Sequence, residues 1–154
     1  MTPDASVSVV GPTAGEVLHL GPLQMRILED GHTTNHRFAL VEGTLPPHTA
    51  GPVQHRHAQH DEGFYVVSGT ARFTVGTTTY DAPAGTLVMV PPGVPHTFAN
   101  PGDQPVILLC TLTPDLYVQY FRDLRDLIAS GQSTPEASAQ LMDRYATVLA
   151  TDEK

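Results

Sequence analysis

Three histidines and two acidic residues lie within the eight positions from 55 to 62, in the stretch HRHAQHDE. Residues two apart in an extended strand point to the same side, so His55 and His57 could hold one cation together. Glu62 begins the next apolar run, and an antiparallel neighbour could bring its carboxylate to the same point. Imidazole and carboxylate groups are typical ligands of divalent first-row metals. The spacing therefore indicates part of a metal site.

A further candidate ligand, His96, follows the turn PPGVP at 91–95 and precedes the run HTFAN. Pro91 and Pro95 stiffen the chain before His96 and so fix the direction from which it enters. Two histidines in a strand are most often surface or hydrogen-bonded residues, so the prediction needs all the candidates together. The resulting mixed nitrogen and oxygen site, with room for water or substrate, consists of His55, His57, Glu62 and His96.

The other histidines and the cysteine are assigned supporting roles. His60 falls in the turn before Glu62, where a surface or supporting position is expected rather than ligation, and Asp61 is expected to be a solvated turn residue. His36 and His48 could line an entrance. Cys110, the single cysteine, lies in the apolar run VILLC and is expected to be a small buried hydrophobe, which excludes an internal disulfide and zinc sites built on paired cysteines.

Short apolar or alternating runs follow one another from about residue 23 to 113, separated roughly every eight to twelve residues by Gly and Pro. Val, Thr, Tyr and Phe are frequent in these runs, as in β-strands. The pattern predicts an all-β sandwich or barrel of seven or more strands. The runs are LQMRILE, RFALVEGTL, GFYVVSG, ARFTVG, TLVMVPP, HTFAN and VILLCTL.

The C-terminal region has helical periodicity. Thr113-Pro114 could supply an N-cap and a first-turn proline, and Ser130-Gly131 would end this helix. The stretch STPE at 133–136 resembles a capping box that starts a second helix. Both helices are expected to pack on the outside of the barrel. Their apolar stripes are Tyr117, Tyr120, Phe121, Leu124, Leu127 and Ile128, and then Leu141, Tyr145, Val148 and Leu149.

These patterns divide one globular domain into three parts. Residues 1–22, rich in Gly, Pro and Thr, are expected to form an N-terminal arm that could pair with another subunit. Residues 23–113 are expected to form the barrel, and residues 114–154 a C-terminal helical extension.

The charge balance excludes several kinds of partner. Sixteen acidic residues against eight Lys and Arg give a net charge of −8, and no basic cluster occurs, so nucleic acid and anionic membranes are poor partners. The longest apolar runs are far shorter than the roughly 20 residues that a bilayer requires. The opening residues lack the basic start of a secretory signal. A cytoplasmic location is therefore expected.

The glycines and prolines around the four candidate ligands form two frames that resemble the motifs of the cupin superfamily, G(X)5HXH(X)3,4E(X)6G and G(X)5PXG(X)2H(X)3N. The second frame, Gly85 to Asn100, agrees throughout, whereas the first has Thr49 where the motif has glycine, and the nearest glycine is Gly51. The resemblance covers roughly residues 35–113. It implies a jelly-roll β-barrel in which His55, His57, Glu62 and His96 bind one divalent first-row metal, drawn from Fe, Mn, Ni, Co, Zn and Cu.

Within the superfamily the chain is most similar to bacterial proteins related to the quercetin 2,3-dioxygenases, in RFALVEGTLPPHTAGPVQHRH, DEGFYVVSGTARFTVG and DLYVQYFRDL. This resemblance implies a metal-dependent dioxygenase that uses O2 on a small aromatic or enolic substrate, with Glu62 as the catalytic base. A non-redox isomerase or cyclase is the alternative, as is a metal- or metabolite-binding protein without turnover. Because cupins are commonly dimers, a homodimer is expected.

The strand period also suggests which side chains line a substrate pocket. Alternate residues of a strand share a face, so two apolar residues share the face of Glu62 and two share the face of His96. These candidates are Phe64, Val66, Val94 and Phe98.

Overall fold

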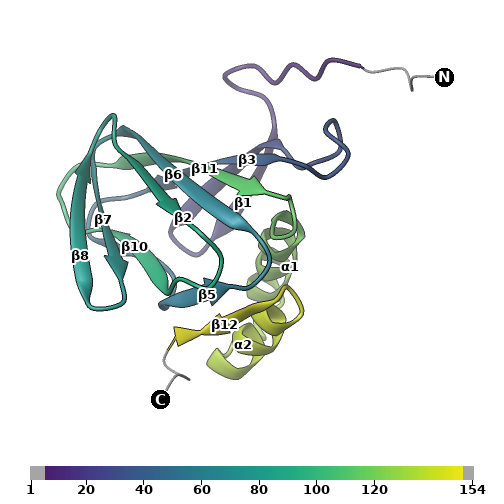
Figure 1. Cartoon of the computed structure of the whole chain (residues 1–154). Helices are drawn as coiled ribbons and strands as arrows, with labels where there is room; N and C mark the ends of the chain where they lie inside the picture. The colour runs from purple at the N-terminus through teal and green to yellow at the C-terminus, as the bar shows by residue number, and fades with distance from the viewer. Residues whose placement is uncertain (1–5, 151–154) are drawn as a thin grey trace.

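The computed structural model describes residues 6–150, which form two facing antiparallel sheets and two C-terminal helices (Figure 1). The first sheet has the order β1-β2-β3-β11-β6-β9. Its strands are β1 (Glu16–Leu20), β2 (Leu23–Glu29), β3 (Ala39–Leu45), β6 (Asp61–Ser68), β9 (Leu87–Val90) and β11 (Val106–Thr113).

The second sheet has the order β12-β5-β10-β7-β8, and β4 also pairs with β10. Its strands are β4 (Thr49–Ala50), β5 (His55–His57), β7 (Thr70–Val75), β8 (Thr78–Pro83), β10 (His96–Asn100) and β12 (Thr147–Leu149). The two sheets curve around a common interior and form the jelly-roll barrel that the sequence predicts (Figure 1).

Side-chain alternation places the core between the sheets. In the central strands β3 and β11, buried residues alternate with partly exposed ones along the whole length, as expected when one face of a strand meets the interior. All seven predicted runs contain a strand. Fully buried apolar side chains include Leu18, Val41, Leu45, Val66, Val106 and Leu112.

The N-terminal arm is shorter than predicted. Glu16–Leu20, assigned to the arm from sequence, forms β1 and pairs along its whole length with β2. The reason is that Leu18 has the apolar side chain that the interior needs, and it is fully buried. The preceding described residues extend away from the barrel (Figure 1), and Val7 and Val9 are exposed there.

The two helices are α1 (Val118–Ala129) and α2 (Pro135–Asp143). Helix α1 starts later than Thr113-Pro114, the predicted start, because Thr113 still pairs with Asp61 as the last residue of β11. It ends as predicted at Ser130-Gly131, where Gly131 has a φ of 74°. Thr134 is the N-cap of helix α2, and its hydroxyl accepts a hydrogen bond from the amide of Ala137.

The predicted second apolar stripe does not continue as a helix. After α2, Ala146 has a φ of 52° and the chain turns into β12, which pairs with β5. Val148 and Leu149 therefore belong to a strand. This strand supplies hydrogen-bonding partners to an edge of β5 that would otherwise be open.

Helix α1 packs against β1, and ion pairs hold it there. The guanidinium of Arg122 lies 3.0 Å from Glu16, the first residue of β1, and 2.9 Å from Asp30, which directly follows β2. Among the residues that the structure describes, no helix is long and apolar enough to cross a membrane.

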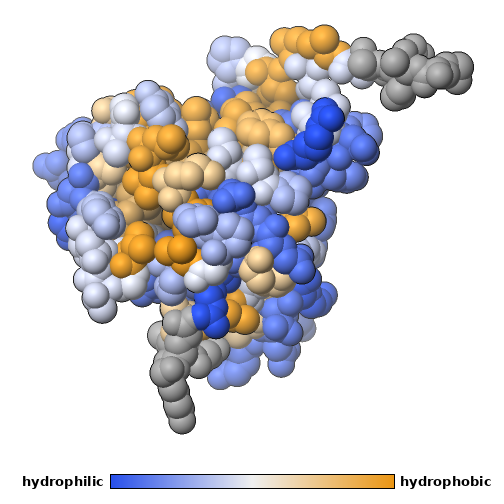
Figure 2. Space-filling model, viewed as in Figure 1, coloured by the Kyte–Doolittle hydropathy of each residue, from blue (hydrophilic) through white to orange (hydrophobic). Residues whose placement is uncertain are grey.

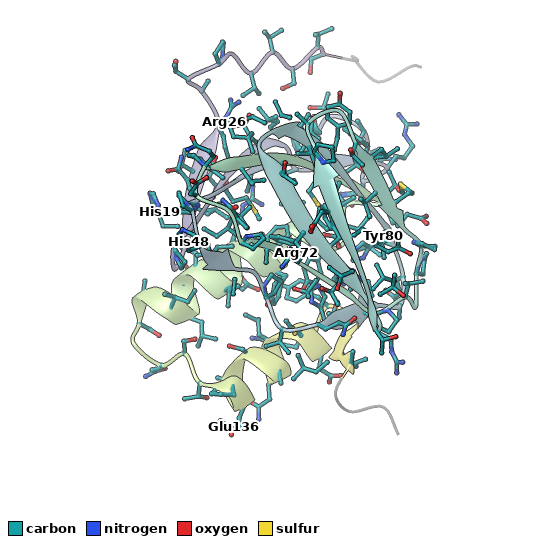
Figure 3. All side chains as sticks on the ribbon, turned by 90° about the vertical axis from the view of Figure 1, so that its left-hand side faces the viewer. His19, Arg26, His48, Arg72, Tyr80 and Glu136 are labelled. Atoms are coloured by element: carbon teal, nitrogen blue, oxygen red, sulfur yellow. The ribbon has the colours of Figure 1, made fainter. Side chains whose placement is uncertain are left out.

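Apolar side chains also gather on the outer face over β6 and on the projecting arm (Figure 2). The exposed apolar residues of β6 and its neighbour β9 are Tyr65, Val67, Leu87 and Met89. The polar outer surface elsewhere includes Arg72 and Tyr80 on the β7–β8 hairpin and Glu136 on α2 (Figure 3).

Candidate metal centre

The two sheets bring the predicted ligands together from opposite sides of the barrel. His55 and His57 lie on β5 with their side chains buried, and His96 on β10 pairs directly with His55. Glu62 comes from β6 in the other sheet. His55 and His57 on β5 therefore face the interior together, as the strand period predicts, and all four side chains are at most 5% exposed.

Gly51, directly after β4, permits the close approach of this segment to β10. A Cβ atom on Gly51 would lie 1.9 Å from the carbonyl oxygen of Phe98, so no other residue fits without moving the backbone. The chain then continues through three residues to His55. The departure from the first motif, Thr49 in place of glycine, thus leaves the required glycine two positions later, where β4 meets β10.

Hydrogen bonds from outside the cluster fix the tautomers of three imidazoles. Nδ1 of His55 lies 2.8 Å from the carbonyl oxygen of Val53, and Nδ1 of His96 lies 2.9 Å from that of Val94. A carbonyl only accepts, so both Nδ1 atoms carry hydrogen. In the neutral form of each ring Nε2 is then the unprotonated atom, and it is free to bind a cation.

His57 is held in the same tautomer by a side chain from the C-terminal extension. Its Nδ1 lies 2.7 Å from Oγ1 of Thr147, and that hydroxyl donates to the carbonyl of Tyr145 at 3.1 Å. Because the hydroxyl has one proton, it must accept from Nδ1–H of His57. Thr147, on β12, was not identified from the sequence, since nothing local marks it as a partner of His57.

The donor atoms in the centre of the cluster lack hydrogen-bond partners. Nε2 of His57, His60 and His96 and Oε2 of Glu62 are buried, and none of them has a hydrogen-bond partner among the described residues. Oε2 of Glu62 lies 2.6 Å from Nε2 of His57 and 3.6 Å from Nε2 of His96. Unprotonated nitrogens and a carboxylate that converge in this way leave negative potential uncompensated, and a divalent cation would compensate it. The residues present fit a metal ion.

The protonation states suit the same purpose. Burial, followed by the nearby His57 and His96, lowers the pKa of His55 to about 4. Burial would raise the pKa of Glu62, but the close imidazoles of His57, His60 and His96 outweigh it and hold that pKa well below its ordinary value. At neutral pH His55 is therefore a neutral imidazole and Glu62 an ionised carboxylate, which are the forms that bind metals.

His60 is buried, in contrast to the surface position considered from the sequence. It is 2% exposed, and its Nε2 lies 3.9 Å from Oε2 of Glu62. Its ring lies 4.3 Å from that of His57 and 5.4 Å from that of Tyr117, which covers it from the start of α1. The sequence contains a signal for the burial of His60. His60 and Glu62 are two positions apart, the same spacing that places His55 and His57 on one face of a strand.

Cys110 is buried as predicted and also contacts the cluster. Its Sγ donates to Oε1 of Glu62 at 3.3 Å, whereas the imidazoles of His57, His60 and His96 lie near Oε2. Burial and then the charge of Glu62 raise the pKa of the Cys110 thiol well above its ordinary value, so the group keeps its proton and acts as a donor. The two oxygens of Glu62 therefore have different surroundings.

A cavity of about 280 Å³ opens beside the cluster. His55 and Glu62 lie at its wall, and the rest of its lining is predominantly apolar. The predicted pocket residues Phe64 and Phe98 line it, whereas Val66 and Val94 do not. Val66 shares the inward face but is fully buried in the core, because parity gives a face and not a position along the barrel.

Helix α1 and the residue before it supply one wall of this cavity. The helical stripe predicted to be core thus also faces the cavity, which sequence periodicity alone could not reveal. The α1 wall is made of Tyr117, Tyr120, Phe121, Leu124 and Ile128.

The remaining histidines stay apart from the cavity. His36 is exposed, and its Nδ1 lies 2.8 Å from Oδ2 of Asp115. This contact raises the pKa of His36. His48 is exposed at the periphery of the barrel (Figure 3), and neither residue lines the cavity as proposed for an entrance. Asp61 is the partly buried first residue of β6 rather than a solvated turn residue.

Comparison with known proteins identifies the family. The cupin domain family model matches residues 41–112. An uncharacterized protein from Streptomyces coelicolor is 40% identical over 78 residues, which are 51% of this chain and 68% of that protein. An uncharacterized protein from Methanocaldococcus jannaschii is 28% identical over 60 residues, 39% of this chain; the match spans about half, 48%, of that relative's length. The chain belongs to the cupin superfamily.

Solved structures agree with this assignment. An RmlC-like cupin from Shewanella frigidimarina is 27% identical with a TM-score of 0.61, over 71% of this chain and 92% of that one. The polyketide cyclase RemF from Streptomyces resistomycificus is 21% identical with a TM-score of 0.62, over 70% and 80% of the two chains. The second likeness concerns the fold alone. Residues 41–112 include all four predicted ligands, whereas Tyr117 and Thr147 lie beyond the matched segment.

Proposed function

We propose that this chain is a metal-dependent cupin enzyme that oxygenates a small apolar aromatic or enolic compound, in the manner of the quercetinase-like proteins. The observation that carries the proposal is the position of His55 and Glu62 at the wall of an otherwise apolar cavity. Such a site combines a reactive polar end with a surface that holds a flat apolar molecule.

In this proposal His55, His57, Glu62 and His96 hold one divalent first-row metal. When bound, the metal would act as a Lewis acid that lowers the pKa of a hydroxyl group on the substrate. The tautomers fixed by Val53, Val94 and Thr147 keep the imidazoles in place without further rearrangement.

Glu62 is proposed as the general base. Its carboxylate is ionised and buried at the cavity wall, within reach of a hydroxyl proton on a substrate placed there. Loss of that proton makes the substrate an electron-rich enolate or phenolate. Molecular oxygen would then add to a carbon of this anion, and because both oxygen atoms enter the product, no organic cofactor or external reductant is required.

The apolar wall has two further roles. Phe64 and Phe98, with ring centroids 5.4 Å apart, would orient a planar substrate, and Tyr117 and Tyr120, stacked at 4.3 Å, would exclude water from the deprotonated form. Burial, followed by the nearby Tyr120 and Glu62, raises the pKa of Tyr117 well above its ordinary value, so it stays a neutral phenol.

A non-redox cyclase is the second candidate, because an apolar cavity suits its substrates equally well. A sugar phosphate isomerase is disfavoured: no lysine or arginine is among the described residues that line the cavity, and a phosphate group would have no cationic partner there. A binding protein without turnover would use the same cavity and ligands.

The discriminating experiment measures O2 consumption with flavonols and simpler enols, using protein loaded separately with Fe, Mn, Ni, Co, Zn and Cu. Uptake is expected with at least one metal, and Glu62→Gln is expected to abolish it while Glu136→Gln, an exposed carboxylate on α2, leaves it unchanged. Substrate conversion without O2 uptake would instead support the cyclase. Binding without conversion under any metal would leave a binding protein.

A further inference from the structure

The cluster contains one donor more than the proposed ligand set. His60 is buried, its Nε2 has no hydrogen-bond partner in the described part of the chain, and this atom lies 3.9 Å from Oε2 of Glu62. A buried imidazole nitrogen without a partner is unfavourable, so such a group usually has a ligand in some functional state of the protein. The ring of Tyr117 shields it from water on one side.

The donor atoms form two overlapping groups of three. In each group the ligand atoms lie within 4.8 Å of one another: one group is His55, His57 and His96, and the other is His57, His60 and Glu62. His57 belongs to both. Glu62 is therefore grouped with His60 as well as with His57, which belongs to the predicted ligand set.

Glu62 also has a second contact available. Its Oε1 accepts a hydrogen bond from the thiol of Cys110, while Oε2 is the oxygen near the imidazoles. If Glu62 is the base, as the proposed function requires, it must loosen from the cation to take up a proton. The Cys110 contact would retain the carboxylate in the site while it does so, and the nearest free donor is then Nε2 of His60.

We infer that His60 is an alternate metal ligand, which binds the cation through Nε2 when Glu62 releases it. The site thus keeps four protein donors whichever of the two residues binds. This inference rests on the proposed function for the reason that Glu62 moves, but the presence of the fifth donor can be tested without substrate or turnover.

The test is a double-mutant cycle on metal affinity, with Co²⁺ as the probe and a chelator as competitor. The variants are Glu62→Ala, His60→Ala and the double variant, with His48→Ala, an exposed histidine outside the cluster, as control. Because either residue can replace the other, each single variant is expected to bind Co²⁺ within about threefold of the parent. The double variant should lose roughly 100-fold or more, well beyond the roughly tenfold loss that additive effects would give. The visible spectrum of bound Co²⁺ should change in Glu62→Ala, as nitrogen replaces oxygen.

Additive effects of the two substitutions would overturn the inference, as would an unchanged affinity on adding His60→Ala to Glu62→Ala. His60→Gln is made in parallel, because it retains side-chain volume without an imidazole; if the alanine variant does not fold, this variant completes the same cycle. If the two substitutions have non-additive effects on Co²⁺ affinity but the protein consumes no O2, His60 is established as an alternate ligand and only the oxygenase is rejected. O2 consumption together with additive effects on metal affinity would support the oxygenase and reject His60 as an alternate ligand.

Discussion

Individual backbone and side-chain groups outside the cluster determine which atoms the cluster can offer to a metal. Two backbone carbonyls and one threonine hydroxyl accept from Nδ1 of His55, His96 and His57, so that each imidazole presents Nε2. A thiol plays the corresponding role for Glu62. These contacts fix the orientation of the imidazoles and of the Glu62 carboxylate.

Replacement of Cys110 tests this control of Glu62. Cys110→Ala removes the donor to Oε1, so the carboxylate loses its fixed orientation, and metal affinity is expected to fall by roughly tenfold. Cys110→Ser retains a donor and should recover most of the affinity, as measured by chelator competition. Equal affinities for the alanine variant and the parent would show that the thiol does not orient the carboxylate.

At the level of elements, the C-terminal extension completes a site that the barrel alone leaves open. Strand β12 pairs with β5 and brings Thr147 to His57, while Tyr117 and α1 wall the cavity. These residues follow the segment, 41–112, that matches the family model.

Thr147→Val tests the contribution of the Thr147 hydroxyl to stability and to metal binding. Valine preserves the shape of the side chain but leaves Nδ1 of His57 without an acceptor, and the loss of a buried hydrogen bond is expected to destabilise the protein by about 1–3 kcal/mol. Metal affinity should fall by roughly tenfold, because the tautomer of His57 is no longer fixed. Urea denaturation and metal titration measure the two effects.

Val148→Ala, a partly exposed position on the same strand, serves as the control and should change metal affinity little. If both variants weaken binding equally, the effect belongs to the strand and not to the hydroxyl.

The sequence predicted the barrel strands because they depend on local period. The four converging side chains were predicted from local spacing together with the resemblance to the two cupin motifs, which links the distant His96 to the others. The sequence did not predict the burial of His60, since that depends on Tyr117 packing over it from a distant part of the chain. Thr147 was missed for the same reason. Helix α1 was placed too early because Thr113 has a partner in β6, Asp61, that outweighs its capacity to cap a helix.

For the whole molecule, the buried cluster couples stability to pH. The pKa of His55 is about 4 in the folded protein and near 6.5 when exposed, so the folded state binds fewer protons between these values. Its contribution to stability is lost as pH falls from 6.5 to 4, by about 3 kcal/mol at roughly 1.4 kcal/mol per pKa unit. Glu62, whose pKa is lowered, loses its contribution below pH 4.5.

His96 has the opposite sign, because Glu62 outweighs burial and raises its pKa, so its contribution is present below pH 6.5 and is lost as pH rises. Net destabilisation in acid is expected for the metal-free protein. His55→Gln should lose less stability than the parent between pH 6.5 and 4, measured by urea denaturation at each pH. Parallel pH profiles of the two proteins would contradict the assignment of His55 as a neutral buried imidazole.

The most direct measurement of the central claim, that the buried histidine and glutamate cluster is a metal site, is the metal content after equilibrium dialysis. Metal-free protein is dialysed against Fe, Mn, Ni, Co, Zn or Cu, and bound metal is determined by elemental analysis. One ion per chain is expected for the parent and for His48→Ala, with little or none for His57→Ala, since His57 belongs to both groups of donors. Full occupancy in His57→Ala, or no bound metal in the parent with any ion, would contradict the account.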